Sequence, residues 1–378
     1  MYSRRHFISS VAALAGLPSA VGAAQPNACN EWSGWNAFRD KFIQADGRVI
    51  DFSADGQSTS EGQAYALFFA LVANDRPTFE RLLEWTRSNL AGGDLSSRLM
   101  AWKWGQRPDG NWGVMDRNAA SDADLWLAYV LFQAARRWHD KSLRAMAELM
   151  QARIEKELVV QVAGVGPVLL PGPQGFALKA GGWKLNPSYL PLPVLRGLAS
   201  EVPSGPWSSL AKTTLTLFES VTPRRLVPDW VAVWPERGFM LDAELGFEGG
   251  HEAIRTYLWA GMMSRQDPDR ARLLERMKGM AALVDQLLVP PARVDAFSGQ
   301  AQGNSPAGFS VALLPYLDAV GAKISAERQR LRIVAMGGIP SVYYEQALGL
   351  FAQGWIEQRF RFAADGRLDW GMTATCKK

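Results

Sequence analysis

The residues of this chain with the clearest chemical potential are carboxylates beside aromatic and apolar runs. Glu61 comes just before the run Ala64–Leu71, and no second charge follows until Asp75. A carboxyl group there either caps a helix or acts in a partly dry cleft. The segment Ser58–Glu61 fits the S-x-x-E pattern of a capping box, and a cap could also fix the backbone that aims an acid.

Two further carboxylate clusters stand before apolar helical patterns. Asp122 and Asp124 lie in Ser-Asp-Ala-Asp, where Ser121 or Asp122 could simply cap the following helix. Glu252 and Arg255 are three residues apart on one helix face, the spacing of an ordinary surface ion pair. The same groups could hydrolyse a glycosidic bond, which needs one protonated and one ionised carboxyl group.

Other chemistries find little support. Only His139 and His251 follow the N-terminal segment, too few for a typical zinc site, and no G-x-S-x-G, G-x-G-x-x-G or P-loop occurs. We therefore predict no metal and no cofactor. The formal charge of +4 falls to +2 without Arg4 and Arg5, so there is no basic stripe for nucleic acid.

The first 24 residues resemble a cleaved export signal of the twin-arginine type. Arg4-Arg5 precedes an apolar stretch, Val11–Val21, that is too short for a membrane span of ~20 residues. We expect a periplasmic or secreted chain with no membrane insertion and one domain over residues 25–378, because no linker divides it. In that oxidising compartment Cys29 and Cys376 could form one bridge, or remain two unpaired thiols.

Helical periodicity dominates the remaining chain and predicts about a dozen helices with short connections. Val159–Leu178 interrupts this helical pattern and is predicted to form a β-hairpin, and Val227–Val233 is predicted to form a further short strand. The expected helices, in chain order, are 35–43, 64–72, 79–90, 125–138, 143–154, 190–198, 210–221, 253–263, 273–288, 309–320, 326–336 and 342–360. Periodicity alone does not distinguish a helical bundle from a barrel.

Several of these segments, taken in order, resemble the family 8 glycoside hydrolases, and most closely the periplasmic endoglucanases associated with bacterial cellulose synthesis. The segments are Ser60–Tyr65, Ser121–Asp124, Asn186–Tyr189, Glu252–Arg255 and Gly354-Trp355. The resemblance implies an all-α (α/α)6 barrel with a small β-hairpin on its rim. It also implies an endo-β-1,4-glucanase of inverting mechanism.

By this resemblance the catalytic residues are Glu61 as general acid, Glu252 as the base that activates water, and Asp122 beside the distorted sugar. Arg255 would orient the ring and the base, and Asp124 would be a supporting residue. The chain departs from the family pattern at Ala123, His251 and Glu252, where the family has Gly, Tyr and Asp. Asp242 and Glu248 lie nearby as rival bases.

The resemblance also implies sugar-binding aromatic residues. Trp102 and Trp104 match a Trp-x-Trp-Gly region, whose indole faces could stack on glucose rings or pack in the core. Tyr189 matches a Tyr close to the attacking water. A further active-site Tyr corresponds to Tyr343 or Tyr344, between which the sequence does not choose.

We therefore expect a hydrolase of cellulose or a similar β-glucan chain, with a cellulose synthase complex as a candidate partner. Two other functions stay open. The same fold could act on chitosan, xylan or mixed-linkage glucan. Alternatively, the protein could bind glucan with impaired catalysis, since glutamate at position 252 places its oxygens about one bond length further out.

Overall fold

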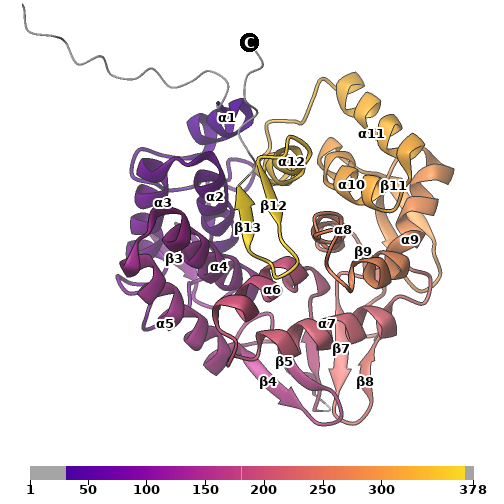
Figure 1. Ribbon diagram of the computed structural model, residues 1–378, viewed down its shortest axis with the longest axis horizontal. Helices are drawn as coiled ribbons and strands as arrows, with labels where there is room; N and C mark the ends of the chain where they lie inside the picture. The colour runs from indigo at the N-terminus through magenta and orange to yellow at the C-terminus, as the bar shows by residue number, and fades with distance from the viewer. Residues whose placement is uncertain (1–30, 180, 371–378) are drawn as a thin grey trace, which may run out of the picture.

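The computed structural model describes residues 31–179 and 181–370. Cys29, Cys376 and the expected export signal lie outside this part of the chain. Within it there are twelve α-helices, each at the position expected from the apolar periodicity. In Figure 1 the chain runs once around the molecule, from α1 through α5 and α7 to α11.

Six of these helices form a closed inner ring. Each even-numbered helix contacts the next, and α12 contacts α2, which closes the circle. The inner helices are α2 (Ser60–Ala73), α4 (Ser121–Trp138), α6 (Leu192–Glu201), α8 (Ala253–Gly261), α10 (Ala307–Ala319) and α12 (Tyr343–Ile356).

The other six helices pack outside this ring. Each one contacts an inner helix that is adjacent in the chain. The outer helices are α1 (Ser33–Phe42), α3 (Arg76–Asn89), α5 (Lys141–Leu158), α7 (Trp207–Val221), α9 (Arg270–Leu287) and α11 (Lys323–Ala335). This alternation of inner and outer helices is an (α/α)6 barrel, as expected.

Burial explains which helices lie inside. Nearly every side chain of α2 and α10 is buried, whereas α11 buries only Ser325, Ala326 and Gln329. A helix that is apolar on all sides must be surrounded by protein, and one with a single apolar stripe belongs at the surface. No helix in the described residues is long and apolar enough to cross a membrane.

Short strands lie in the connections between the helices and after α12. The expected hairpin is present as β4 (Val159–Val162) and β5 (Gly166–Leu169), and the expected strand near Val227 begins four residues later, as β7. The remaining strands were not anticipated from the sequence. They are β1 (Ser58–Thr59), β2 (Lys103–Gln106), β3 (Trp112–Asp116), β6 (Trp183–Leu185), β8 (Gly238–Met240), β9 (Glu248–Gly249), β10 (Pro291–Asp295), β11 (Ala301–Asn304), β12 (Phe360–Phe362) and β13 (Leu368–Trp370), with β7 at Val231–Trp234.

The order of the helices fixes the direction of the inner ring. Since each outer helix returns the chain to the same end, all six inner helices run in parallel. Their N-termini therefore meet at one end of the barrel and their C-termini at the other. The candidate residues Glu61, Asp122, Glu252 and Tyr343 all stand at inner-helix N-termini.

Candidate active site

Glu61 is the second residue of α2, but the helix is capped differently from the expected capping box. The N-cap is Thr59, whose hydroxyl accepts a hydrogen bond from Gly62 N at 3.1 Å. Ser58 belongs to β1, where its hydroxyl donates to Val49 O at 2.6 Å. The prediction that Ser58–Glu61 forms a capping box is therefore wrong, because Ser58 is paired in strand β1 and Thr59 is the N-cap. The Glu61 side chain is left free for other partners.

Trp102 stands directly beside this carboxyl group. Its Nε1 donates to Glu61 Oε1 at 3.2 Å, while 39% of the residue is exposed. The β1–β2 pairing and the hydrogen bond from Ser60 N to Trp102 O, at 2.9 Å, hold the two segments together. An exposed indole next to the acid is placed to stack on a sugar ring.

Trp104 has a more structural setting than Trp102. It packs edge-on against buried Trp85 and stacks on exposed Trp112, with ring centroids 5.3 and 5.4 Å away. The Arg48 guanidinium lies over both Trp104 and Trp112. Trp104 thus joins the core to an exposed aromatic surface, so both interpretations of the tryptophans apply to this region.

Arg255 is the centre of the site. The residue is only 5% exposed, so the interpretation of Glu252 and Arg255 as a surface ion pair is wrong. Its Nη1 donates to Asp122 Oδ2 at 2.9 Å and to the Tyr65 hydroxyl at 3.1 Å, and its Nη2 contacts Glu252 Oε2. One guanidinium thus joins the N-termini of α2, α4 and α8.

Asp122 and Asp124 have different surroundings although both are buried. Asp122 faces Arg255, and its other oxygen accepts from Ala123 N at 2.9 Å. The N-cap of α4 is Ala120, so neither Ser121 nor Asp122 caps this helix. Asp124 accepts from Met100 N at 3.0 Å and is fully buried, which fits a supporting rather than a sugar-contacting residue.

Glu252 is the N-cap residue of α8, and its carboxylate is held by several donors. Asn186 Nδ2 donates to Oε2 at 2.9 Å and the Ser188 hydroxyl at 3.4 Å. The Glu252 side chain remains 34% exposed, so water can reach it. The sequence singled out the Asn186–Tyr189 segment for Tyr189 alone, whereas Asn186 and Ser188 are the residues that hold Glu252.

The rival bases lie in other environments. Glu248 is exposed and pairs with Arg293 at 3.3 Å, and Asp242 accepts a backbone hydrogen bond from Glu244 at 2.9 Å. Asp229, which the sequence did not suggest, accepts from Gly250 N and Ala253 N at 2.8 and 2.7 Å. It therefore fixes the backbone on both sides of Glu252.

The three tyrosines expected from the sequence, Tyr189, Tyr343 and Tyr344, differ in their surroundings. The Arg255 guanidinium lies 5.4 Å from the Tyr189 ring centroid. Tyr344 is half-buried and donates to the backbone carbonyl of His251. Tyr343 is buried, its ring packs on Phe38, and its hydroxyl has no partner among the described residues. Tyr344 is thus the more accessible member of the pair.

The surroundings of the two candidate catalytic carboxyl groups shift their pKa values in opposite directions. Burial, followed by repulsion from Asp122, raises the pKa of Glu61 to about 8 against the weaker opposing effect of Arg255. Burial alone would raise the pKa of Glu252 too, but Arg255, Asn186 and Ser188 together hold that pKa below its ordinary value. Near neutral pH, Glu61 is therefore protonated and Glu252 ionised, which is the arrangement of an acid and a base.

Comparison with known proteins places this arrangement in a family. Residues 10–358 match the model of Glycosyl hydrolases family 8. An endoglucanase of Xanthomonas axonopodis pv. citri is 45% identical, covering 95% of this chain and 94% of that protein. One from Escherichia coli is 43% identical, with 93% and 95% covered.

A solved structure agrees with these relatives. The endo-1,4-D-glucanase of Vibrio fischeri superposes with a TM-score of 0.84 at 37% identity, covering 90% of this chain and 99% of the other. Sequence and fold thus agree over nearly the whole length of both proteins. The chain is a glycoside hydrolase that belongs to glycosyl hydrolase family 8.

Proposed function

We propose that this protein is an endo-β-1,4-glucanase that cleaves cellulose or a related β-glucan by an inverting mechanism. The observation that carries the proposal is the placement of two carboxyl groups at the same end of the barrel: Glu61 lies beside the exposed Trp102 indole, and Glu252 is held by Arg255. The opposite pKa shifts of the two groups support it. The endoglucanase names of relatives at 43–46% identity support the choice of polymer.

Each residue has a defined part in the proposed reaction. Glu61 protonates the oxygen of the leaving sugar, and Glu252 removes a proton from the water that attacks the anomeric carbon on the opposite face. Asp122, held by Arg255, lies beside the reacting sugar and binds its hydroxyls. Trp102 stacks on a neighbouring ring, and Tyr189 and Tyr344 border the site.

The test is hydrolysis of carboxymethylcellulose by the wild type, Glu61→Gln and Glu252→Gln. Both variants should lose on the order of 10²–10⁴ in kcat, the range of general acid–base catalysis. Glu248→Gln is the matched control, since it neutralises an exposed carboxylate nearby. Retained activity in Glu252→Gln together with loss of activity in Glu248→Gln would assign the role of general base to Glu248.

Two measurements separate the remaining alternatives. Reducing-sugar release from chitosan, xylan and mixed-linkage glucan should be weaker than from carboxymethylcellulose. Binding of cello-oligosaccharides without any release would instead indicate a glucan-binding protein. Inversion predicts that the first product observed by proton NMR is the α-anomer, because the cleaved bond is β.

We also propose that residues 1–24 direct export to the periplasm, where residues 25–378 act as one catalytic domain in cellulose biosynthesis. The Arg4-Arg5 pattern and the following apolar stretch support export. Replacing both arginines by lysine should retain the chain in the cytoplasm, as fractionation would detect. Co-purification with a cellulose synthase complex would test the biosynthetic setting.

A further inference from the structure

A large cavity lies at the end of the barrel opposite Glu61 and Glu252. Its volume is about 770 Å³, and its walls are the C-terminal turns of α8, α10 and α12, the start of α9, and the β12–β13 hairpin. Gly261, Ala319 and Trp355, near the ends of three inner helices, all line it. The length of the inner ring therefore separates this cavity from the carboxylates.

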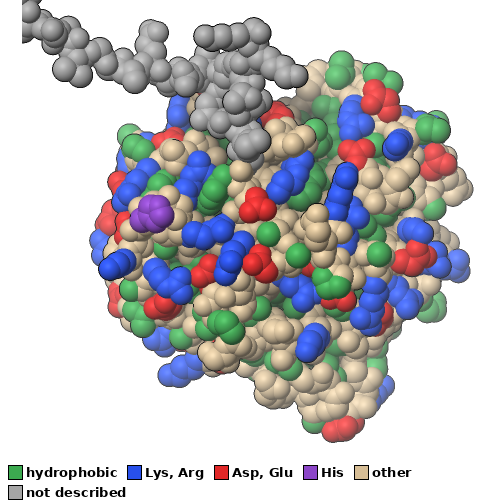
Figure 2. Space-filling view, viewed as in Figure 1, with side chains coloured by type: hydrophobic (Ala, Val, Ile, Leu, Met, Phe, Trp, Pro, Cys, Tyr) green, Lys and Arg blue, Asp and Glu red, His purple; other side chains and the backbone are tan. Residues whose placement is uncertain are grey.

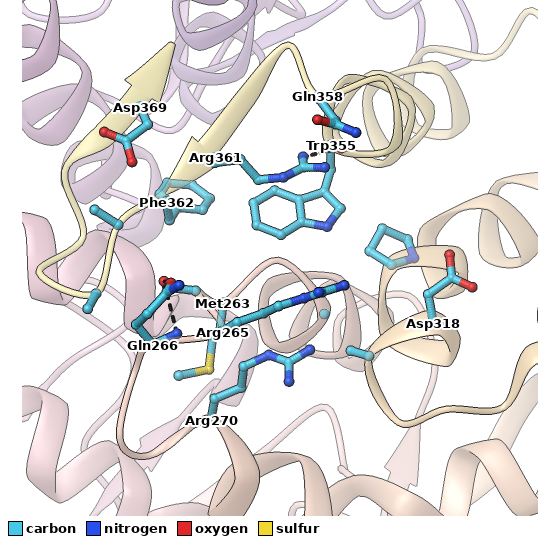
Figure 3. A pocket seen from close by; sticks show the side chains of 16 residues that line it. Met263, Arg265, Gln266, Arg270, Asp318, Trp355, Gln358, Arg361, Phe362 and Asp369 are labelled. Carbon is cyan, nitrogen blue, oxygen red and sulfur yellow. Dashed lines mark hydrogen bonds between the residues drawn. The ribbon is translucent and has the colours of Figure 1, made fainter. Parts of the chain in front are cut away.

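Three arginines from three different segments line the cavity. Arg265 follows α8, Arg270 is the first residue of α9, and Arg361 is in β12. In Figure 3 the Arg265 and Arg270 side chains lie below the Trp355 indole, and Arg361 lies along its upper side. In Figure 2, Lys and Arg side chains lie around the middle of the face that carries the β12–β13 hairpin, with Asp and Glu side chains among them.

No carboxylate in residues 31–179 and 181–370 forms an ion pair with any of these three arginines. The neighbouring acids form ion pairs with other arginines. Asp318 pairs with Arg330 at 2.7 Å, and Asp267 pairs with Arg196 at 3.2 Å, as does Asp269. Asp369 also lines the cavity and stands opposite Arg361 in the β12–β13 ladder, but it forms no ion pair with Arg361, and in Figure 3 its carboxylate lies away from Arg265 and Arg270.

The guanidinium groups of Arg270 and Arg361 are partly desolvated as well as unneutralised. Arg361 lies 4.2 Å from the Trp355 ring centroid, and its Nη1 donates to Trp355 O and, at 3.0 Å, to Phe360 O, which fixes its position. Arg270 Nε is buried and has no hydrogen-bond partner among the described residues. Burial, and then repulsion from Arg265, lowers the pKa of both Arg270 and Arg361.

We propose that this cavity binds a small, multiply charged oxyanion through Arg265, Arg270 and Arg361, remote from the site of hydrolysis. Guanidinium groups match phosphate and carboxylate oxygens with paired N–H donors, and a bound anion would neutralise their mutual repulsion. The cavity volume is that of an ordinary small-molecule site. A neutral glucan chain would leave the three charges uncompensated, so the ligand differs from the proposed substrate.

Calorimetric titration with pyrophosphate and, separately, with citrate tests the proposal. The wild type should bind at least one of them at a single saturable site, and Arg265→Ala should weaken this binding by about tenfold or more. The double variant Arg265→Ala/Arg270→Ala should abolish it. Preference for pyrophosphate would indicate a phosphate-bearing ligand, and preference for citrate a polycarboxylate.

Arg276→Ala is the matched control, because Arg276 is an exposed arginine on α9 that does not line the cavity. It should bind like the wild type. Equal weakening in Arg276→Ala and Arg265→Ala, or no saturable binding of either probe at millimolar concentration, would overturn the proposal. Carboxymethylcellulose hydrolysis should be unchanged in Arg265→Ala, so this result is independent of the proposed hydrolytic function.

Discussion

A single buried guanidinium organises the candidate active site at the scale of individual residues. Arg255 contacts Asp122 and Glu252, and its charge favours the ionised form of both carboxyl groups. Glu61 forms no ion pair with Arg255 in the described residues and is dominated by burial and by repulsion from Asp122. The contrast between Glu61 and Glu252 therefore comes from burial and repulsion by Asp122 at Glu61, and from Arg255, Asn186 and Ser188 together at Glu252.

The pH dependence of hydrolysis follows from these shifts. Glu61 must be protonated, so kcat/KM should fall as pH rises through its pKa of about 8. Asp122→Asn removes a negative charge beside Glu61, which favours the ionised form and should lower that pKa. We expect the alkaline limb of the pH–rate profile to move to lower pH, in addition to a loss of rate.

Asp94→Asn is the control for this experiment, because Asp94 is an exposed carboxylate whose Oδ1 accepts hydrogen bonds from Ser96 in the same turn. Its alkaline limb should coincide with that of the wild type. An unchanged limb in Asp122→Asn would mean that Glu61 is not the group titrating there.

The length of the Glu252 side chain gives a second prediction at this scale. Its Oε2 is held at once by Asn186, Ser188 and Arg255. Glu252→Asp withdraws the carboxylate from these donors by about a bond length, and ~1 Å of misplacement can lower a rate on the order of 100-fold. Steady-state kinetics should show a lower kcat with KM little changed. A Glu252→Asp variant as fast as the wild type would contradict this.

The sequence predicted the types of the reacting groups better than their partners. Glu61, Asp122 and Glu252 were candidates because each precedes an apolar helical pattern, and the resemblance to family 8 gave them their catalytic roles. The donors of Glu252 could not, since Asn186 lies 66 residues away and is brought close only by the barrel. The i, i+3 spacing of Glu252 and Arg255 was also misleading, because a buried arginine and a surface one share that spacing.

At the scale of elements, the N-terminus of α2 positions the general acid. Thr59→Ala removes the side-chain acceptor for Gly62 N and should lower the free energy of unfolding by ~1 kcal/mol. It should also lower kcat, because Glu61 lies two residues further on and depends on this turn. Thr59→Ser keeps the hydroxyl and is the matched control. Chemical denaturation and hydrolysis assays on both variants provide the check.

Helices were predictable here and most strands were not, for a physical reason. A helix of ten or more residues shows its apolar period within its own sequence. Strands such as β1, two residues long, show no period, and their pairing depends on a distant partner, as Ser58 pairs with Trp104. The β1–β2 contact that sets Trp102 beside Glu61 was therefore not visible in the sequence.

At the scale of the whole molecule, the barrel is held by contacts between distant parts of the chain. The turn of the β12–β13 hairpin packs on α4 and α6, where Gly366 O accepts from the Tyr129 hydroxyl at 2.8 Å. Leu368 N donates to Gln133 Oε1 at 3.0 Å in the same region. The hairpin of the last two described strands is thus held against α4, in the first half of the chain.

Gly366 is the residue on which this closure depends. Its φ is +77°, and an added Cβ would lie 2.1 Å from Gly197 N and 2.3 Å from Pro193 O. Gly366→Ala therefore combines backbone strain with a collision against α6. Gly338 also has a positive φ, of +98°, but nothing lies within 4 Å of its Cβ position, so Gly338→Ala reports the strain alone.

We expect Gly366→Ala to lower the free energy of unfolding by roughly 1–3 kcal/mol more than Gly338→Ala, the usual range for overpacking a well-packed site. Urea denaturation followed by tryptophan fluorescence measures this difference. The collision must displace the hairpin from α4 and α6, so the cavity lined by Arg361 should be disturbed as well. Equal loss of stability in the two variants would mean that the hairpin moves aside freely and that α2–α12 packing alone closes the ring.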